Sequence, residues 1–344
     1  MAMLFWEAQR RARSRTKVYL IAFFLMTLFV AAGCEWAFRT FQVQNISSQD
    51  SPYGALYEES SNSSFPVMGG SYLAITYLVA LFQYLAYRTS GGGYVARQLG
   101  ARQIDPSGRP LEEQRLYHLV EEMSIASGMP MPEVYVLDVD AVNAFAAGLK
   151  QDRAAITVTR GALRQFNRQE LQGVIAHEFG HIYNGDMKIS LRLAAMLMGF
   201  FIVLYLGLRL LQSVTLTGRR NRQGGNPIAL AAIILVVAGA VTWFFGALLR
   251  AMVSREREYL ADACAVQFTR SSEGISNALR KLQKLQDEGM ADDMPKQGMA
   301  YAHLYFSHRQ FFSGLFATHP PLKDRIAAIE GHSYDPGKKL NADR

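Results

Sequence analysis

The chain alternates long apolar runs with polar segments. A helix needs about 20 apolar residues to cross the hydrocarbon core of a bilayer, and four runs reach or approach that length. The third run contains Arg192 and Arg209 near its ends, so their charged groups would have to extend to the bilayer surface. We therefore predict an integral membrane protein with transmembrane helices, of which the third is the weakest candidate. The runs cover residues 18–34, 68–87, 189–211 and 228–249.

The polar segments define the expected domains. Residues 88–188 and 251–344 are predicted to form one soluble domain together, interrupted by a hairpin of two apolar helices at 189–250. Residues 1–87 are predicted to form an N-terminal membrane region with two transmembrane helices and an external loop at 35–67.

Shorter periodicities predict the fold inside the first polar segment. Leu116, Leu119 and Met123 share one face at helical spacing. Three stretches after them are typical of short strands separated by polar turns. These stretches are "EVYVLD" (133–138), "VNAFAAG" (142–148) and "AAITVTRG" (154–161).

Charge adds an orientation to this arrangement. The net charge is +7, and much of the excess flanks the apolar runs, which favours a membrane protein over a nucleic-acid-binding protein. Arginines and a lysine precede the first run, whereas residues 35–67 carry mainly acidic groups. We therefore expect the N-terminus and the chain from about residue 88 to be cytoplasmic. Arg219, Arg220 and Arg222, between the third and fourth runs, oppose this rule, so that pair either spans against it or forms a hairpin that does not fully cross.

The two cysteines, Cys34 and Cys264, exclude a disulfide framework and a C-x-x-C metal motif. "FVAAGC", ending at Cys34, also allows a lipoprotein cleavage site after an apolar leader. The three further apolar runs, and Ala31 where leucine is usual, favour an integral protein.

The stretch "VIAHEFGHIYNGD" (174–186) carries the strongest chemical signal. His177 and His181 lie one helical turn apart, so both imidazoles can hold one Zn²⁺ ion. Glu178 projects beside them and can act as the general base on an attacking water. Asn167 with Glu170 predicts the start of this helix. The alternative is a solvated helix face with two unrelated histidines.

A catalytic zinc ion normally has a third protein ligand. The metzincin continuation is excluded, because Asn184 occupies its glycine position and no third histidine follows. "SREREYLADACA" (254–265) offers Glu258 as a ligand, and Asp262, one turn later, can accept the N–H of a ligating histidine. The alternative is a solvated charged helix with local Arg–Glu pairs.

"HEFGH" with "NGD", then "REYLADA", then "THPP", between paired apolar segments, resembles the HtpX-like membrane zinc metalloproteases, which are relatives of the prenyl-protein endopeptidases. The resemblance covers most of the chain from about residue 68. It implies a mostly helical fold with a gluzincin-like metalloprotease domain, whose small β-sheet aligns the substrate along its edge. It also implies one zinc ion per chain on His177, His181 and Glu258, with Glu178 as general base and Asp262 behind the ligands.

"VNAFAAG" resembles a segment of the same family. The resemblance implies that Asn143 and Phe145 belong to a substrate-binding strand that offers backbone pairing. The alternative is an ordinary buried strand with a turn-forming asparagine.

"ATHPPLKDR" is a further match. Pro320 and Pro321 cannot lie inside a helix, so His319 is expected in a loop ahead of one. The resemblance places His319 at the active cleft, where it stabilises the oxyanion, and gives Arg325 a supporting role. The alternative is that His319 caps the last helix.

Together these features predict a zinc metalloendopeptidase of the bacterial inner membrane with a cytoplasmic active site. The resemblance implies misfolded or damaged membrane proteins as substrates, hence quality control, with the lipid bilayer and other membrane quality-control proteins as partners and no nucleic acid. One alternative is a dedicated processing protease for a specific or lipidated peptide. Another is a non-catalytic membrane adaptor containing zinc, although no cysteine lies in any motif to complete a structural site. The external loop is longer than expected for the simplest family members.

Overall fold

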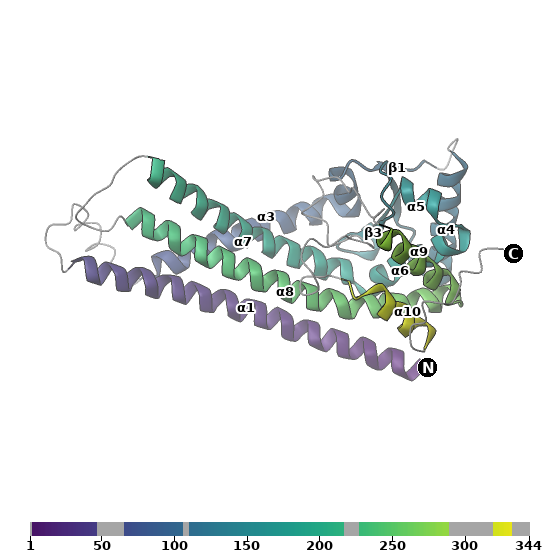
Figure 1. The fold of residues 1–344 in the computed structure, drawn as a ribbon, viewed down its shortest axis with the longest axis horizontal. Coiled ribbons are helices and arrows are strands. Elements are labelled where there is room, and N and C mark those ends of the chain that lie inside the picture. Colours follow the sequence, from purple (N-terminus) through teal and green to yellow (C-terminus); the bar gives the residue numbers. More distant parts are fainter. Residues whose placement is uncertain (1, 47–64, 106–109, 217–226, 289–318, 332–344) are drawn as a thin grey trace. The chain divides into compact units, whose positions relative to one another are not determined.

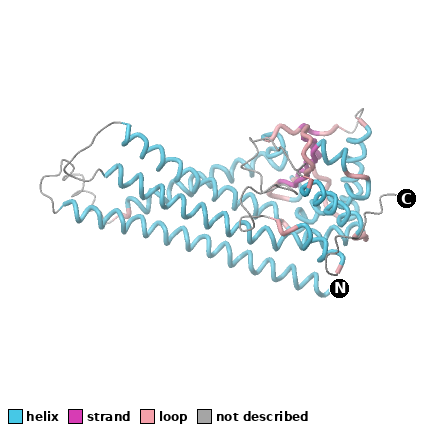
Figure 2. Tube along the Cα trace, in the orientation of Figure 1, coloured by secondary structure: helices cyan, strands magenta, loops and turns pink. Residues whose placement is uncertain are grey.

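The computed structural model describes residues 2–46, 65–105, 110–216, 227–288 and 319–331. Helices dominate these residues, and the strands gather in one small region (Figure 2). The chain divides into two compact units. The sheet unit comprises residues 1–15, 85–192 and 250–344, and the helical unit comprises residues 16–84 and 193–249.

The helices and strands follow one another along the chain as Figure 1 labels them. The helices are α1 (Ala2–Ile46), α3 (Val67–Gln98), α4 (Leu111–Ser127), α5 (Arg160–Gln165), α6 (Arg168–Asn184), α7 (Asp186–Leu216), α8 (Pro227–Thr269), α9 (Glu273–Asp287) and α10 (Leu322–Glu330), with a 3₁₀ turn at Gln151–Arg153. The strands are β1 (Arg102–Gln103), β2 (Glu133–Leu137), β3 (Ala144–Ala147) and β4 (Ala155–Thr159).

Among the described residues, four helices are long and apolar enough to cross a membrane. The prediction of an integral membrane protein, mainly α with a small sheet, is thereby confirmed. The apolar segments are Leu20–Phe41, Val67–Thr89, Asp186–Val214 and Ile228–Thr269.

The segment expected to open the external loop is helical instead. Helix α1 continues to Ile46, and within it Glu35 and Arg39 form an ion pair one turn apart (2.6 Å between Oε1 and Nε). The rest of that loop up to residue 64, and the turn with Arg219, Arg220 and Arg222, lie outside the described residues.

Close backbone contacts hold the helical unit together. A Cβ atom added to Gly239 would lie 2.5 Å from the backbone nitrogen of Leu204, and one added to Gly69 would lie 2.5 Å from the carbonyl oxygen of Ala31. Small residues at helix crossings let backbones approach in this way inside membranes. The Glu35 carboxylate also accepts hydrogen bonds from the first backbone N–H groups of α3.

The sheet unit contains a four-stranded sheet in the order β1-β2-β4-β3. Strands β2 and β4 are parallel, and β1 and β3 add antiparallel at the two edges. All three strands predicted from the sequence are present. Val136 and Ile156 contribute to a core shared with α4, α6 and α9, while Tyr135 belongs to a separate cluster on alternate positions of the same strands.

Candidate metal centre

Helix α6 carries the histidine pair, and its ends are fixed locally. The side chain of Asn167 accepts a hydrogen bond from the Glu170 N–H, and the Glu170 side chain accepts one from the Asn167 N–H, as the sequence predicts. Gly185 ends the helix in the left-handed conformation (φ 71°). Ile175 and Phe179 are fully buried in the core, which fixes the rotation of the helix.

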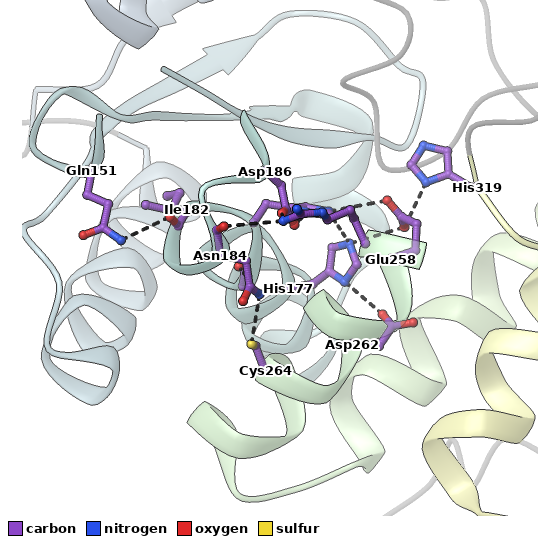
Figure 3. Close-up of polar contacts among 12 residues, drawn as sticks. Gln151, His177, Ile182, Asn184, Asp186, Glu258, Asp262, Cys264 and His319 are labelled. Carbon is purple, nitrogen blue, oxygen red and sulfur yellow. Dashed lines mark hydrogen bonds and ion pairs between the residues drawn. The ribbon is translucent and has the colours of Figure 1, made fainter. Parts of the chain in front are cut away.

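Helices α6 and α8 pass very close to each other beside the motif. A Cβ atom added to Gly180 would lie 2.9 Å from the Cα of Ala261. Asn184 spans the same contact, since its Nδ2 donates to the Gly180 carbonyl (2.9 Å) and to the sulfur of Cys264 (3.4 Å; Figure 3). The carboxylates of α8 on either side of Ala261 therefore reach the histidines of α6.

Three donor groups converge at this contact. The Nε2 atoms of His177 and His181 are 3.1 Å apart, and Glu258 places one carboxylate oxygen 3.6 Å from the first and the other 3.5 Å from the second. Ligands of a tetrahedral zinc ion at about 2.0–2.2 Å lie roughly 3.3–3.6 Å apart. Two imidazoles and one carboxylate are also a donor set that catalytic zinc uses, so these residues fit such an ion.

A carboxylate backs each imidazole on its other nitrogen. Nδ1 of His177 lies 2.9 Å from Asp262, and Nδ1 of His181 lies 3.0 Å from Asp186 (Figure 3). Carboxylates accept hydrogen bonds, so each Nδ1 carries the proton and each Nε2 presents its lone pair to the common point.

Each backing carboxylate has an arginine partner. Arg325, fully buried, donates two hydrogen bonds to Asp262 (2.9 and 2.7 Å) and lies 3.1 Å from Glu258. Arg257 contacts the second oxygen of Asp186.

The charges of the buried groups also suit a divalent cation. Metal binding requires both histidines as neutral donors, and the four ionised carboxylates then exceed the two guanidinium groups by two negative charges. A divalent cation would balance that excess. The carboxylates belong to Glu178, Asp186, Glu258 and Asp262, and the guanidinium groups to Arg257 and Arg325.

Glu178 lies beside the donor set and is 3% exposed. Burial raises the pKa of Glu178 to about 7, and the Glu258 charge adds to this, while His181 and a hydrogen bond from the backbone of Ala146 act in the opposite direction. A carboxyl group with a pKa near neutrality can both take up and release a proton at physiological pH.

The two histidines differ in proton affinity. Burial lowers the pKa of His177 to about 4, although Asp262 opposes the shift. Burial alone would lower the pKa of His181 too, but hydrogen bonds to Asp186 and Glu258 outweigh it and raise the pKa well above its usual value. For Arg325, the charges of Asp262 and Glu258 outweigh burial and raise the pKa.

A pocket that is open to solvent lies directly against Glu178 and His181. Its walls come from β3, from the first turns of α7 and from α8. Apart from the charged side chains and the histidines, the side chains that line it are apolar or carry only a hydroxyl group. These wall residues are Ala146, Met187, Ile189, Ser190, Val253 and Ser254.

Histidine 319 lies at the same cavity, ahead of α10, which begins after Pro321. Its Nδ1 is 2.9 Å from Glu258, and its side chain is 13% exposed (Figure 3). It does not belong to the three-donor cluster found among the described residues. The loop position agrees with the sequence-based expectation, and its catalytic role stays a prediction.

Asn143 and Phe145 are both buried, at 1% and 0% exposure. The Asn143 side chain accepts a hydrogen bond from the Ala144 N–H (2.9 Å). Thr159 N–H donates to the Asn143 carbonyl, so in the antiparallel pairing the backbone groups of Ala144 and Ala146 point away from β4. These backbone groups therefore point away from the sheet, although all four residues of β3 are buried, and the expected substrate role of Asn143 and Phe145 stays a prediction.

The sequence reasoning did not find Asp186 and Arg257. Asp186 stands in the quoted "NGD", directly after the glycine that reverses the chain, and this was the one available signal. Arg257 precedes Glu258 in a run of alternating charges, which is more typical of a solvated helix face.

Comparisons with known proteins show the family of this chain by sequence. The profile of peptidase family M48 matches residues 110–333. A "Protease HtpX homolog" from Bacteroides fragilis (strain YCH46) is 30% identical over 329 residues, covering 94% of this chain and 97% of that protein. Another from Levilactobacillus brevis is 36% identical over 264 residues, with 74% and 85% covered. The crystal structure of S. mikatae Ste24p aligns with a TM-score of 0.47 and 16% identity, covering 91% of this chain and 66% of that one.

Proposed function

The chain belongs to peptidase family M48 and is a membrane metalloprotease, and from this premise we propose that it is a zinc endopeptidase with His177, His181 and Glu258 as metal ligands. The observation that supports this ligand set is the convergence of Glu258, from α8, on both Nε2 atoms of α6. When bound, zinc would supply Lewis-acid chemistry that acidifies water and polarises a carbonyl group.

Glu178 acts as the general base and then the general acid of the reaction. It takes a proton from the attacking water and delivers it to the departing amine of the cleaved peptide bond. Its burial beside the donor set and its pKa near 7 support both transfers. His319, at the same cavity, donates to the oxyanion that develops on the scissile carbonyl, and Arg325 holds Glu258 and Asp262 in place.

The substrate lies extended along β3. Strand β3 ends the sheet, and the backbone groups of Ala144 and Ala146 point away from β4. Their N–H groups are engaged by Asn143 and Glu178, so an added peptide would pair with the carbonyl groups. An extended peptide that adds to such an edge gains backbone hydrogen bonds without regard to sequence. Asn143 shapes this edge by holding the Ala144 N–H, and Phe145 anchors the strand from the buried side.

The substrates are misfolded or damaged membrane proteins, and the enzyme resides in the bacterial inner membrane with its active site on the cytoplasmic side. Recognition through backbone groups supports a broad substrate range. The Lys/Arg-rich segments before the first span and after the second support the orientation. Other quality-control proteins of the membrane are the expected partners.

The test compares purified wild type with Glu178→Gln in detergent, on casein and on an unfolded membrane protein, with and without chelator. The variant is expected to retain one zinc per chain, measured by elemental analysis, and to lose at least about a hundredfold in cleavage rate. Glu121→Gln, an exposed carboxylate on α4, is the matched control and should cleave like wild type. Equal cleavage by wild type and Glu178→Gln would refute the assignment, and cleavage confined to one narrow peptide motif would indicate a dedicated processing protease.

A further inference from the structure

The two histidines of the metal centre have matching supports, but only the support of His177 was given a role from the sequence. His177 is backed by Asp262 and Arg325, and His181 is backed by Asp186 and Arg257. We infer that Asp186, held by Arg257, is a positioning residue that fixes the tautomer and the ring orientation of His181 for metal binding. This inference rests on the proposed metal site.

The position of Asp186 follows from the end of helix α6. Gly185 adopts φ 71° and ψ 24°, a left-handed conformation in which a side chain is strained, and the chain turns there before α7 begins. This turn brings Asp186, five residues after His181, back to the imidazole, with 3.0 Å between Oδ2 and Nδ1. The side chain of Asp186 is only 5% exposed, so water cannot readily replace this hydrogen bond.

Arg257 fixes the other oxygen of the same carboxylate. Its Nη1 contacts Oδ1 of Asp186 and lies 3.5 Å from the carbonyl oxygen of Asn184. The Arg257 side chain is 6% exposed, and its neighbour in sequence, Glu258, faces the histidines. A buried carboxylate without a partner would be costly, so Arg257 both neutralises Asp186 and limits its rotation.

The consequence for His181 is a defined tautomer. A carboxylate only accepts hydrogen bonds, so Nδ1 keeps its proton, and the nitrogen that gives up a proton to bind the metal is Nε2, which faces Glu258 and His177. An asparagine at position 186 could turn its amide N–H toward Nδ1, which would move the imidazole proton to Nε2 and block metal binding. Loss of such a partner typically weakens metal affinity about 10–100-fold.

A purely structural ion pair between the start of α7 and α8 would behave differently. Its loss would lower the stability of the fold but leave the zinc affinity of the folded protein unchanged. Metal affinity, measured separately from the thermal stability of the zinc-depleted protein, therefore separates the two roles.

The experiment uses the full chain in detergent and measures the zinc dissociation constant by competition with a chromophoric chelator. Asp186→Asn is expected to raise this constant about 10–100-fold, and Asp262→Asn to raise it by a comparable factor. Arg257→Lys keeps the positive charge without the guanidinium fork, so a smaller rise is expected. Asp140→Asn is the matched control, because Asp140 is an exposed partner of Arg164 elsewhere in the sheet unit.

Two further readouts keep the outcomes distinct. With cobalt(II) as the probe, Asp186→Asn should alter the visible absorption spectrum, whereas Asp140→Asn should not. If Asp186→Asn does not fold, Arg257→Lys and Asp186→Glu provide the same test. An Asp186→Asn dissociation constant within about threefold of wild type, with an unchanged cobalt spectrum, would overturn the inference. If the proposed metal site itself is wrong, the wild type will bind no zinc, or will bind it equally well after His177 and His181 are replaced.

Discussion

The sheet unit and the helical unit bury different kinds of polar group. Within the described residues, the helical unit buries hydroxyl groups but no charged side chain, for example on Thr27, Thr76 and Thr242. The sheet unit buries many ionisable side chains. These are Glu113, Glu170, His177, Glu178, Asp186, Arg257, Glu258, Asp262 and Arg325.

The difference shows how each unit compensates the cost of burial. Most buried charged groups of the sheet unit form ion pairs, as Glu113 does with Arg102 and Arg160. In the helical unit, the hydroxyl groups of Thr27 and Thr242 donate to backbone carbonyls of their own helices, at Phe23 (2.8 Å) and Ala238 (2.7 Å). Paired buried charges are expensive to maintain, and most of those in the sheet unit gather around one donor set. Buried charged groups therefore concentrate at the candidate metal centre of the sheet unit, whereas close helix packing is typical of the helical unit.

The largest effect is expected when a buried charge loses its partner. Arg325→Met removes the cation that faces both Asp262 and Glu258, so the free energy of unfolding should fall by about 3–5 kcal/mol. Equilibrium unfolding of the purified protein in mixed micelles measures this loss. Arg325→Lys should lose less, because it keeps the charge but not the bidentate geometry.

The matched control is an exposed pair in the same unit. Arg164 and Asp140 are 3.1 Å apart, with side chains 61% and 92% exposed. Arg164→Met should therefore cost less than about 1 kcal/mol. If both arginine variants lost the same stability, the distinction between buried and exposed charge would not hold.

A smaller effect is expected from tightening a helix crossing in the helical unit. The Cβ atom of Gly239→Ala would lie 2.5 Å from the Leu204 backbone nitrogen, so the helices must separate, at a cost of about 1–3 kcal/mol. The same unfolding measurement should show this loss with an unchanged zinc dissociation constant.

Gly33→Ala is the control, because nothing lies within 4 Å of its added Cβ atom. It should be neutral, or should stabilise the helix by up to about 1 kcal/mol. If Gly239→Ala lowered both the free energy of unfolding and the zinc affinity, helix packing in the helical unit would not be independent of the metal centre.

The smallest effect is expected from a buried hydroxyl group. Thr242→Val keeps the shape of the side chain and removes one hydrogen bond to the backbone carbonyl of Ala238, which retains its place in the helix. The free energy of unfolding should change by less than about 1 kcal/mol. If Thr242→Val lowered the free energy of unfolding as much as Arg325→Met does, buried hydroxyl groups would stabilise the helical unit as strongly as buried ion pairs stabilise the sheet unit.

The sequence predicted the elements well where one local rule dominates. Apolar runs located the spans, and alternating apolar residues located strands such as Glu133–Leu137. The ends of helices were harder to place. Helix α8 runs from Pro227 to Thr269, because nothing between its apolar part and the charged "SREREY" segment breaks a helix, although the composition changes sharply there.

The candidate site was predictable for residues with a characteristic local spacing. His177, Glu178 and His181 occupy one helical turn, and Glu258 and Asp262 occupy another. The partnership of Asp186 with Arg257 depends on a left-handed turn and on the crossing of α6 and α8, which no local period encodes. The burial of Phe145 likewise depends on which face of the sheet is covered.

Anomalous diffraction from crystals of the zinc-loaded protein, recorded at the zinc absorption edge, would locate the metal directly. One strong peak per chain is expected, about 2.0–2.2 Å from Nε2 of His177, Nε2 of His181 and a carboxylate oxygen of Glu258. A zinc peak bound elsewhere, or one at the two histidines with Glu258 out of reach, would contradict the proposed ligand set.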